Sequence, residues 1–468
     1  MKRRLLAGLL LAAGLASSAG AGEWNAWPVR VDLRDEEMES REEQVLGPLY
    51  ARHEDEGGET WEAWRPLLLA TRTGTSEATY FLYPLFIWRK DDGYSRFSFF
   101  DLVNDSRIAP EAGKLAERDL DVWPFYFSRE TGDPDTTYHA LFPFAGTIRY
   151  RFGKDSLTWR LFPFYFHTEV KGKRVTSAPW PFIRVIDGAG HHGFEFWPLA
   201  GSRGRDGDYR EQFYLWPFGY KSEQNLSAPV PDERFGVLPF YARETGPGYR
   251  AESYVWPFFG YTHRTEPVRY DEMRYLWPLF VQGRGDDRYI DRWGPFYTHS
   301  RIKGYDKTWV LWPLFRRGIW DDDRLTQEKT QILYFVYWSQ EQWRRGHPKD
   351  APAYKRHLWP LFSAWDNGAG RSQFQLFSPF DVFFPNNDIV RRLYTPLFAI
   401  YRSDRRGTEY SSRSLFWHLV SWKKSPTGEE FHLAMFGWGR ETGAAHGRFF
   451  LFDFSRKQAT SSSPAATP

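Results

Sequence analysis

The sequence contains no cysteine, which excludes disulfide bridges and a lipid-bearing cysteine at the start of the exported chain. Neither sign of charge dominates, because Lys and Arg together number 62 and Asp and Glu together number 59. General nucleic-acid binding requires a net basic face, so this balance argues against nucleic acid as a partner. Disorder is not expected either, because aromatic residues make up 19% of the chain and supply apolar area to bury. Stability must therefore come from packing.

Long apolar runs are also scarce. One run extends from Leu5 to Leu15, after a basic start at 2–4 and before the small residues 19–21. At about eleven residues it is shorter than the roughly 20 that a membrane-spanning helix needs. The pattern is typical of a cleaved export signal, and it predicts a location in a bacterial cell envelope, either the periplasm or the outer membrane. We expect four segments: a signal peptide at 1–21, an acidic N-terminal leader at 22–46, a β-repeat domain at 47–454 and a disordered polar tail at 455–468.

The sequence is rich in a short aromatic phrase with a proline at its centre. The phrase reads RYLWPLF at 274–280, and it returns as WVLWPLF ending at Phe315 and as HLWPLF ending at Phe362. Looser versions recur at intervals of roughly 17 to 22 residues and give about 22 units. A fixed period of this length is the signature of a repeat architecture.

Turn-forming residues lie between consecutive phrases, as in the DDG at 91–93 and the DNG at 366–368. Glycine, asparagine and aspartate supply the positive φ angles that tight hairpins need. One such turn per period predicts one long strand per period. Strands joined by short links run antiparallel, so we expect an all-β, up-and-down meander of about 22 strand units.

A proline within a strand donates no ladder hydrogen bond, and sheets tolerate it at bends and bulges. We therefore expect each strand to bend at its proline, so that the surrounding rings gather into a buried hub and the sheet closes into a shallow barrel with radiating hairpins. The alternative fold is a transmembrane β-barrel, whose period and turn spacing also fit. It is disfavoured because so many unpaired acceptors at mid-depth would be costly in hydrocarbon.

The expected hub consists of the tryptophan and proline of each complete phrase. Its members are Trp123, Pro124, Trp180, Pro181, Trp197, Pro198, Trp216, Pro217, Trp256, Pro257, Trp277, Pro278, Trp312, Pro313, Trp359 and Pro360.

The tandem WPLF, WPFF and LFPF phrases, flanked by hairpin turns, resemble the β-flower family over 47–454. The resemblance implies a shallow symmetric barrel with an apolar centre and hairpins that radiate as petals. It also implies an envelope or membrane-associated protein. Many members are expected to carry a lipid-attachment cysteine, which this chain lacks.

Catalytic motifs are missing from the sequence: it has no nucleophile elbow, no phosphate-binding glycine loop and no zinc spacing. The adjacent pair His191 and His192 has no third ligand at motif spacing, so a solvated turn is the simpler interpretation. We expect no enzyme activity, no cofactor and no metal. The leading hypothesis is an envelope scaffold or a binder of lipid or another apolar ligand. An outer-membrane channel and a glycan-binding repeat protein are the alternatives, and protein partners are not indicated.

Overall fold

The structure, a computed structural model, describes residues 24–35, 40–110, 116–347 and 352–451. The expected signal peptide and polar tail lie outside the described residues. The described chain forms one antiparallel sheet of 43 strands, in which each strand pairs with the next along the sequence. The prediction of an all-β, up-and-down repeat is confirmed.

The strands are β1 (Trp24–Ala26), β2 (Arg30–Asp35), β3 (Ser40–Val45), β4 (Tyr50–Asp55), β5 (Glu59–Trp64), β6 (Leu68–Thr73), β7 (Ser76–Phe81), β8 (Phe86–Asp91), β9 (Tyr94–Phe99), β10 (Val103–Ile108), β11 (Glu117–Val122), β12 (Tyr126–Glu130), β13 (Tyr138–Leu141), β14 (Ala145–Arg151), β15 (Lys154–Arg160), β16 (Tyr165–Val170), β17 (Lys173–Ser177), β18 (Ile183–Gly188), β19 (His191–Phe196), β20 (Ala200–Arg205), β21 (Tyr209–Tyr214), β22 (Gly219–Gln224), β23 (Asp232–Val237), β24 (Tyr241–Gly246), β25 (Tyr249–Tyr254), β26 (Phe259–Arg264), β27 (Tyr270–Tyr275), β28 (Phe280–Gly285), β29 (Arg288–Trp293), β30 (Tyr297–Ile302), β31 (Tyr305–Val310), β32 (Phe315–Asp321), β33 (Leu325–Ile332), β34 (Tyr337–Arg344), β35 (Ala353–Leu358), β36 (Phe362–Asp366), β37 (Arg371–Leu376), β38 (Tyr401–Arg406), β39 (Tyr410–Leu415), β40 (Val420–Ser425), β41 (Gly428–Leu433), β42 (Phe436–Glu441) and β43 (Arg448–Leu451). Two short helices, α2 (Asp388–Leu393) and α3 (Thr395–Phe398), lie between β37 and β38.

The proline phrases form hairpin turns. Tyr275 at the end of β27 pairs directly with Phe280 at the start of β28, so the LWPL at 276–279 reverses the chain. The N–H of Leu279 donates to the carbonyl oxygen of Leu276 at 2.8 Å, and the peptide bond before Pro278 is cis. A cis proline at the third position defines a type VI turn. The expectation of one long strand bent at its proline is therefore wrong: each period holds two short strands and two turns.

The two kinds of turn occupy opposite edges of the sheet. We call the edge that carries the turns of the aromatic phrases, such as 276–279 and 311–314, the proline edge. We call the opposite edge, with turns such as 171–172 and 303–304, the glycine edge. Gly304 shows why glycine is used on that edge, because its φ of 77° lies in the left-handed region that other residues rarely adopt.

The register also separates the two faces of the sheet, because cross-strand partners point to the same side. Near the N-terminus, Ala63, Leu69 and Tyr80 are cross-strand partners and belong to one face. We call this side the inner face. It is the face whose side chains on β2–β4 and on β38–β41 line a common cavity. We call the other side the outer face.

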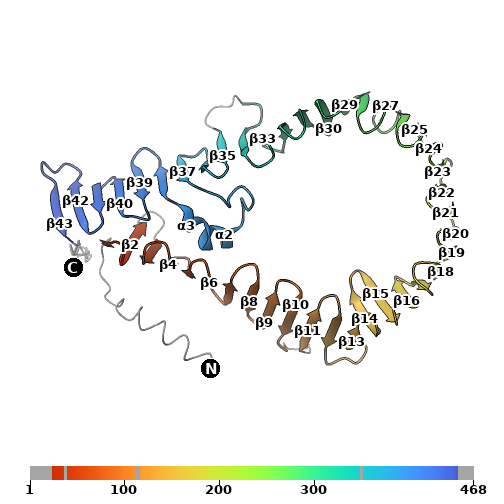
Figure 1. Cartoon of the computed structure of the whole chain (residues 1–468), viewed down its shortest axis with the longest axis horizontal. Helices are drawn as coiled ribbons and strands as arrows, with labels where there is room; N and C mark the ends of the chain where they lie inside the picture. Colours follow the sequence, from red (N-terminus) through yellow and green to blue (C-terminus); the bar gives the residue numbers. More distant parts are fainter. Residues whose placement is uncertain (1–23, 36–39, 111–115, 348–351, 452–468) are drawn as a thin grey trace, which may run out of the picture.

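The sheet curves into a ring whose strand ladder does not close (Figure 1). Among the described residues, β1 pairs only with β2 and β43 only with β42. The closed shallow barrel with radiating hairpins, and a barrel of the transmembrane type, are therefore not observed. The physical reason is that β1 and β43 do not pair with each other. Side-chain packing, rather than backbone hydrogen bonds, holds the two ends of the sheet together.

The insertion 377–400 joins the two ends of the sheet, with α2 and α3 lying between β37 and the first strands (Figure 1). Leu393 of α2 is fully buried against a cluster that includes Ala51, Ala63 and Leu69. The amide of Val390 donates to the side chain of Asn387 at 3.1 Å and caps the start of α2. Buried apolar packing thus completes the ring.

The expected boundary at residue 47 does not separate two structural units. β2 and β3 of the acidic segment pair with each other, and β3 pairs with β4, so the described residues before 47 begin the same sheet. Glu42 of this segment lines the cavity between the two ends. The sequence predicts a separate acidic leader here because charge alone does not indicate strand pairing.

Candidate functional site

The tryptophans of the proline edge are exposed. The exposed fraction is 57% for Trp123, 53% for Trp216 and 57% for Trp312. The expectation that these rings form a buried hub does not hold within the chain. These tryptophans are exposed because they lie in turns, and a side chain at the tip of a hairpin has no neighbouring strand to pack against. Trp197 is the most covered of the eight and is half-buried.

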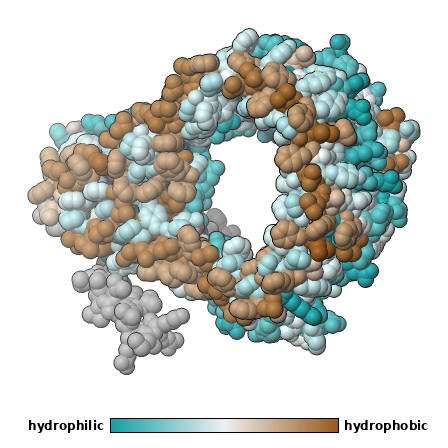
Figure 2. All heavy atoms as spheres, turned by 45° about the vertical axis from the view of Figure 1, so that its right-hand side comes forward, coloured by the Kyte–Doolittle hydropathy of each residue, from teal (hydrophilic) through white to brown (hydrophobic). Residues whose placement is uncertain are grey.

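Aliphatic and phenyl side chains surround these rings along the same edge. The exposed members at or beside the proline-edge turns are Leu46, Leu49, Leu67, Phe100, Leu102, Phe125, Phe144, Leu161, Phe164, Phe182, Leu199, Leu215, Phe218, Phe240, Val255, Phe258, Leu276, Leu279, Phe296, Leu311, Leu314 and Leu361. Figure 2 shows apolar residues gathered in a band along the mouth of the ring, with polar residues over its outer side. An exposed apolar strip of this extent marks an interaction surface rather than ordinary surface scatter.

The backbone of the proline edge is paired from one turn to the next. The N–H of Trp277 donates to the carbonyl oxygen of Phe258 at 2.8 Å, and the N–H of Gly294 donates to that of Leu279 at 2.6 Å. The N–H of Leu311 continues the series to the carbonyl oxygen of Phe296 at 2.7 Å. These bonds use polar groups that would otherwise face outward, so the edge can leave water at low cost in unpaired hydrogen bonds.

The glycine edge has the opposite character. Its turns carry charged residues such as Asp92, Lys171, Asp206 and Asp287, all exposed. A surface that keeps its charges hydrated at one edge and presents aromatics at the other is amphipathic across its width. The six-residue strands, as in β27, set the separation of the two edges at about 20 Å.

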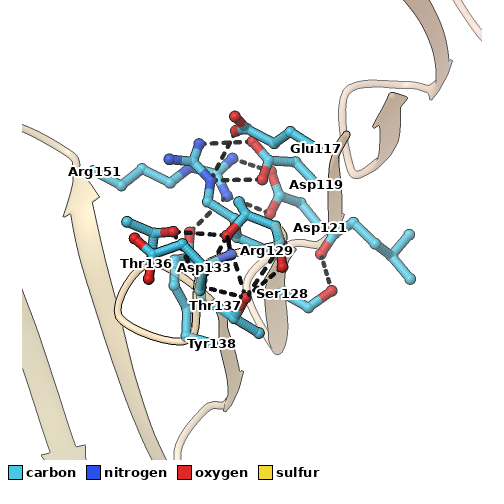
Figure 3. A network of polar contacts seen from close by, with 12 residues as sticks. Glu117, Asp119, Asp121, Ser128, Arg129, Asp133, Thr136, Thr137, Tyr138 and Arg151 are labelled. Atoms are coloured by element: carbon cyan, nitrogen blue, oxygen red, sulfur yellow. Dashed lines mark hydrogen bonds and ion pairs between the residues drawn. The ribbon is translucent and has the colours of Figure 1, made fainter. Parts of the chain in front are cut away.

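Charges on the inner face are paired over much of the ring. In Figure 3, Arg129 of β12 lies among the carboxylates of β11. Its Nε donates to Asp119 at 2.8 Å and lies 3.1 Å from a carboxylate oxygen of Glu117. The hydrogen bond that Arg129 donates to Asp119 is the main cause that raises the pKa of Arg129. This network therefore holds β11 and β12 together and leaves little free charge.

Arg151 extends the same network across the sheet. Its Nη1 donates to a carboxylate oxygen of Asp121 at 2.8 Å, and Asp121 is only 9% exposed (Figure 3). Burial by itself would lower the pKa of Arg151, but the hydrogen bonds to Asp121 and Tyr138 outweigh it, and the pKa is raised. The pair is structural, because each partner satisfies the other.

A second inner-face network follows along the ring. Arg184 and Arg203 both contact Glu195, at 3.0 Å and 3.4 Å. Arg203 also donates to Glu211 at 2.6 Å. Cations and carboxylates alternate here, so no net charge accumulates.

A cavity of about 330 Å³ lies where the two ends of the sheet face each other. Its walls include Glu42 from the first strands and Arg402, Asp404 and His418 from the last ones. Asn25 bridges the two walls by donating from Nδ2 to the carbonyl oxygen of His418 at 3.2 Å. Burial lowers the pKa of His418 to about 4, so the ring is neutral at pH 7. Cations and carboxylates both line the cavity, so the two ends of the sheet can face each other without net repulsion.

The histidine pair lies at the start of β19, immediately after a glycine-edge turn. Nδ1 of His191 is 3.2 Å from the hydroxyl of Tyr209, and Nδ1 of His192 is 3.4 Å from a carboxylate oxygen of Asp206. Within the described ranges, no group of three or more side chains is arranged to hold a metal ion.

Comparison of the chain with protein-family models and with curated proteins finds no match. In the part of the chain that the structure describes, no helix combines the length and apolarity needed to cross a bilayer.

The sequence reasoning missed one group of charged residues, Arg288, Arg292, Lys307, Arg316 and Lys329. Their register places them all on the inner face. The signal that could have found them is the parity of each residue counted from the nearest proline-edge turn. That count requires two strands per period, whereas the sequence suggested one.

Proposed function

We propose that this protein is an exported, non-enzymatic component of a bacterial cell envelope that attaches to a membrane surface through its proline edge. The observation that carries the proposal is the continuous row of exposed aromatic and aliphatic turns along one edge of a ring. Tryptophan and tyrosine favour the boundary between acyl chains and headgroups, where one side of the ring is apolar and the other hydrated.

The energetics support attachment to lipid. Transfer of apolar surface out of water contributes about 25 cal/mol per Å². Each turn offers two or three exposed apolar side chains, as Leu276, Trp277 and Leu279 do at 46%, 42% and 44% exposure. Many weak contributions along one edge add to firm attachment, while the charged glycine edge stays in water. This is the arrangement of a protein that lies on a membrane.

Vesicle flotation tests the proposal. The wild-type protein is expected to float with phosphatidylcholine vesicles, and a triple variant with Trp123, Trp256 and Trp277 each replaced by Ser is expected to bind at least tenfold more weakly. A matched variant replaces three exposed apolar residues outside the proline edge, Phe152, Val230 and Ile302, by Ser. Equal flotation of the two variants would contradict the proposal.

Glycan binding is the second candidate, because exposed aromatic rings at hairpin tips are the feature that it requires. The tips carry few groups that could orient a sugar: at 276–279 the indole N–H is the only polar side-chain group. Specific polar ligands need several convergent hydrogen-bonding groups. Retention of the protein on immobilised envelope glycan, with no flotation, would favour this second function.

A further inference from the structure

The inner face of β29–β33 differs from the rest of the inner face in its charge. Its cations are Arg288, Arg292, Lys307, Arg316 and Lys329, and the described residues of these strands place no carboxylate on that face. The carboxylates of the same strands lie on the outer face, among them Asp306 and Glu328. We call these five cations, with the rings beside them, the basic wall.

The carboxylates of the outer face are engaged by outer-face cations. Arg301 donates to Asp306 at 2.9 Å, and Arg317 donates to Glu328 at 2.8 Å. These carboxylates are therefore paired on the outer face and do not neutralise the cations of the basic wall on the opposite face. The wall is a local excess of positive charge, although the protein as a whole is nearly neutral.

Neutral groups position the cations of the wall. The guanidinium carbon of Arg316 lies 5.0 Å from the ring centroid of Trp309, and its Nη1 donates to Gln331 at 3.3 Å. Nζ of Lys329 lies 5.3 Å from the ring centroid of Trp338. Cation–π and amide contacts hold a cation in place without cancelling its charge.

The cations of the wall also repel one another. Burial and the nearby cations Arg316 and Arg292 lower the pKa of Lys307, and burial and Arg316 lower the pKa of Lys329. No anion contributes to either shift. An anionic occupant would relieve this repulsion, and guanidinium and ammonium groups are well suited to phosphate.

The position of the wall relates it to the proline edge. Arg292 and Arg316 each lie two residues from a proline-edge turn, at 294–296 and 311–314. With a rise of about 3.3 Å per residue, their Cα atoms lie about 7 Å behind the turn. The headgroup region on each side of a bilayer is about 5–8 Å deep. If the turns reach the acyl chains, these cations lie at the depth of the headgroups.

We propose that the basic wall binds the phosphate of an anionic lipid headgroup whose acyl chains lie against the proline edge. This inference rests on the proposed membrane attachment and deepens it, because it assigns lipid selectivity to one sector of the ring. Arg292 and Arg316 provide the charges at headgroup depth, and Trp309, whose ring lies against the guanidinium of Arg316, provides an apolar surface for the glycerol region.

The test compares vesicles of phosphatidylcholine alone with vesicles that also contain phosphatidylglycerol. The double variant Arg292→Gln, Arg316→Gln removes the two cations of the wall that lie nearest the proline edge. The matched variant Arg301→Gln, Arg317→Gln removes two cations from the outer face, one on β30 and one on β32. The two variants therefore have the same net charge. Urea unfolding midpoints close to that of the wild type establish that both variants are folded.

The wild-type protein and the outer-face variant are expected to bind the phosphatidylglycerol vesicles more tightly than the neutral ones. The wall variant is expected to bind the phosphatidylglycerol vesicles about 30-fold more weakly, because each of the two missing cations contributes about 1 kcal/mol near an anionic surface. Its binding to neutral vesicles should not change. If it retains full preference for phosphatidylglycerol, or if the wild type shows none, the inference is wrong even where flotation itself succeeds.

Soluble glycerol 3-phosphate and inorganic phosphate separate a lipid headgroup from a free phosphate ligand. Each is titrated into the wild-type protein and the wall variant without vesicles. Little heat and no stabilisation is the expected result. Tight binding of either compound by the wild type, lost in the wall variant, would assign the wall to a soluble phosphate and overturn its role in lipid selection.

Discussion

Nε of Arg65 donates to the carbonyl oxygen of Arg392 at 2.7 Å and so joins residues 327 positions apart. Arg65 is 5% exposed, and burial lowers its pKa to about 10, so it remains charged at pH 7. Arg392 itself contacts Glu59 at 2.5 Å, and the hydroxyl of Tyr394 donates to the carbonyl oxygen of Tyr83 at 2.7 Å. These contacts, with the buried Leu393, close the ring.

The first prediction concerns this closure. Leu393→Ala is expected to cost about 2–5 kcal/mol, because it leaves a cavity at a fully buried site. The loss should open the ring locally rather than unfold the sheet, since the strand ladder does not pass through α2.

Spin labels at Arg72→Cys and Arg391→Cys, both exposed positions, should report a longer and broader distance in the Leu393→Ala background. As a control, Arg391→Ala changes an exposed side chain of α2. It should leave the distance between labels at Arg72→Cys and Asp388→Cys unchanged. An unchanged distance in the Leu393→Ala protein would show that the insertion does not hold the ring.

The second prediction contrasts two tryptophans. Trp277 is 42% exposed at a proline-edge turn, whereas Trp159 is 2% exposed in a core cluster with Ile148 and Phe127. Trp277→Ser is expected to change the free energy of unfolding by less than about 1 kcal/mol. Trp159→Ala should cost about 3–5 kcal/mol. Urea denaturation followed by circular dichroism measures both, and a large cost for Trp277→Ser would mean that the proline edge is covered within the free protein.

The third prediction concerns the network in Figure 3. Asp121→Asn removes the carboxylate that pairs with Arg151 in a partly buried site. Leaving the guanidinium without its partner should cost about 3 kcal/mol. The exposed Asp135 lies in the adjacent loop, and Asp135→Asn is expected to have almost no effect on the urea midpoint. Equal effects from the two substitutions would contradict the structural role of the pair.

The fourth prediction is a pH dependence at the cavity between the sheet ends. The pKa of His418 is lowered to about 4 by burial, against an ordinary value of 6.5, so the unfolded chain takes up a proton before the folded one does. Its contribution to stability is therefore full above pH 6.5 and is lost as the pH falls toward 4, by about 2 kcal/mol for a partly buried ring. Glu42 and Asp404 oppose the shift, and Arg402 and His432 favour it.

A His418→Gln variant should lose less stability than the wild type between pH 6.5 and pH 4, as measured by urea midpoints across that range. His139 is an exposed histidine, and His139→Gln should leave the pH dependence unchanged. Parallel pH curves for the wild type and His418→Gln would show that His418 does not carry this dependence.

The sequence predicted the class of fold because its strongest signal is local. Short turns at fixed spacing require antiparallel neighbours, and that inference needs no long-range contact. The number of strands was predicted incorrectly because the composition of the segment from Leu276 to Phe280 is compatible both with a strand and with a type VI turn. The choice depends on whether Tyr275 pairs with Phe280, which composition does not reveal.

The candidate site was predicted in part. The tryptophans were identified as a group, but their exposure follows from the turn and was missed with it. The basic wall could not be found without the strand register, since Asp306 and Lys307 are adjacent in sequence and lie on opposite faces. Contact of residue 65 with residue 392 could not be predicted either, because no local pattern determines where the insertion packs.

Membrane attachment through the proline edge is tested most directly by single-site spin labelling. The chain has no cysteine of its own, so each introduced cysteine carries the only label. Leu279→Cys places it at a proline-edge turn and Asp287→Cys at the next glycine-edge turn. On addition of vesicles, the label at 279 should become more accessible to oxygen and less accessible to a water-soluble nickel chelate, while the label at 287 should not change. If the label at 279 stays as accessible to the nickel chelate with vesicles as without them, the proline edge does not enter lipid and the proposed attachment is contradicted.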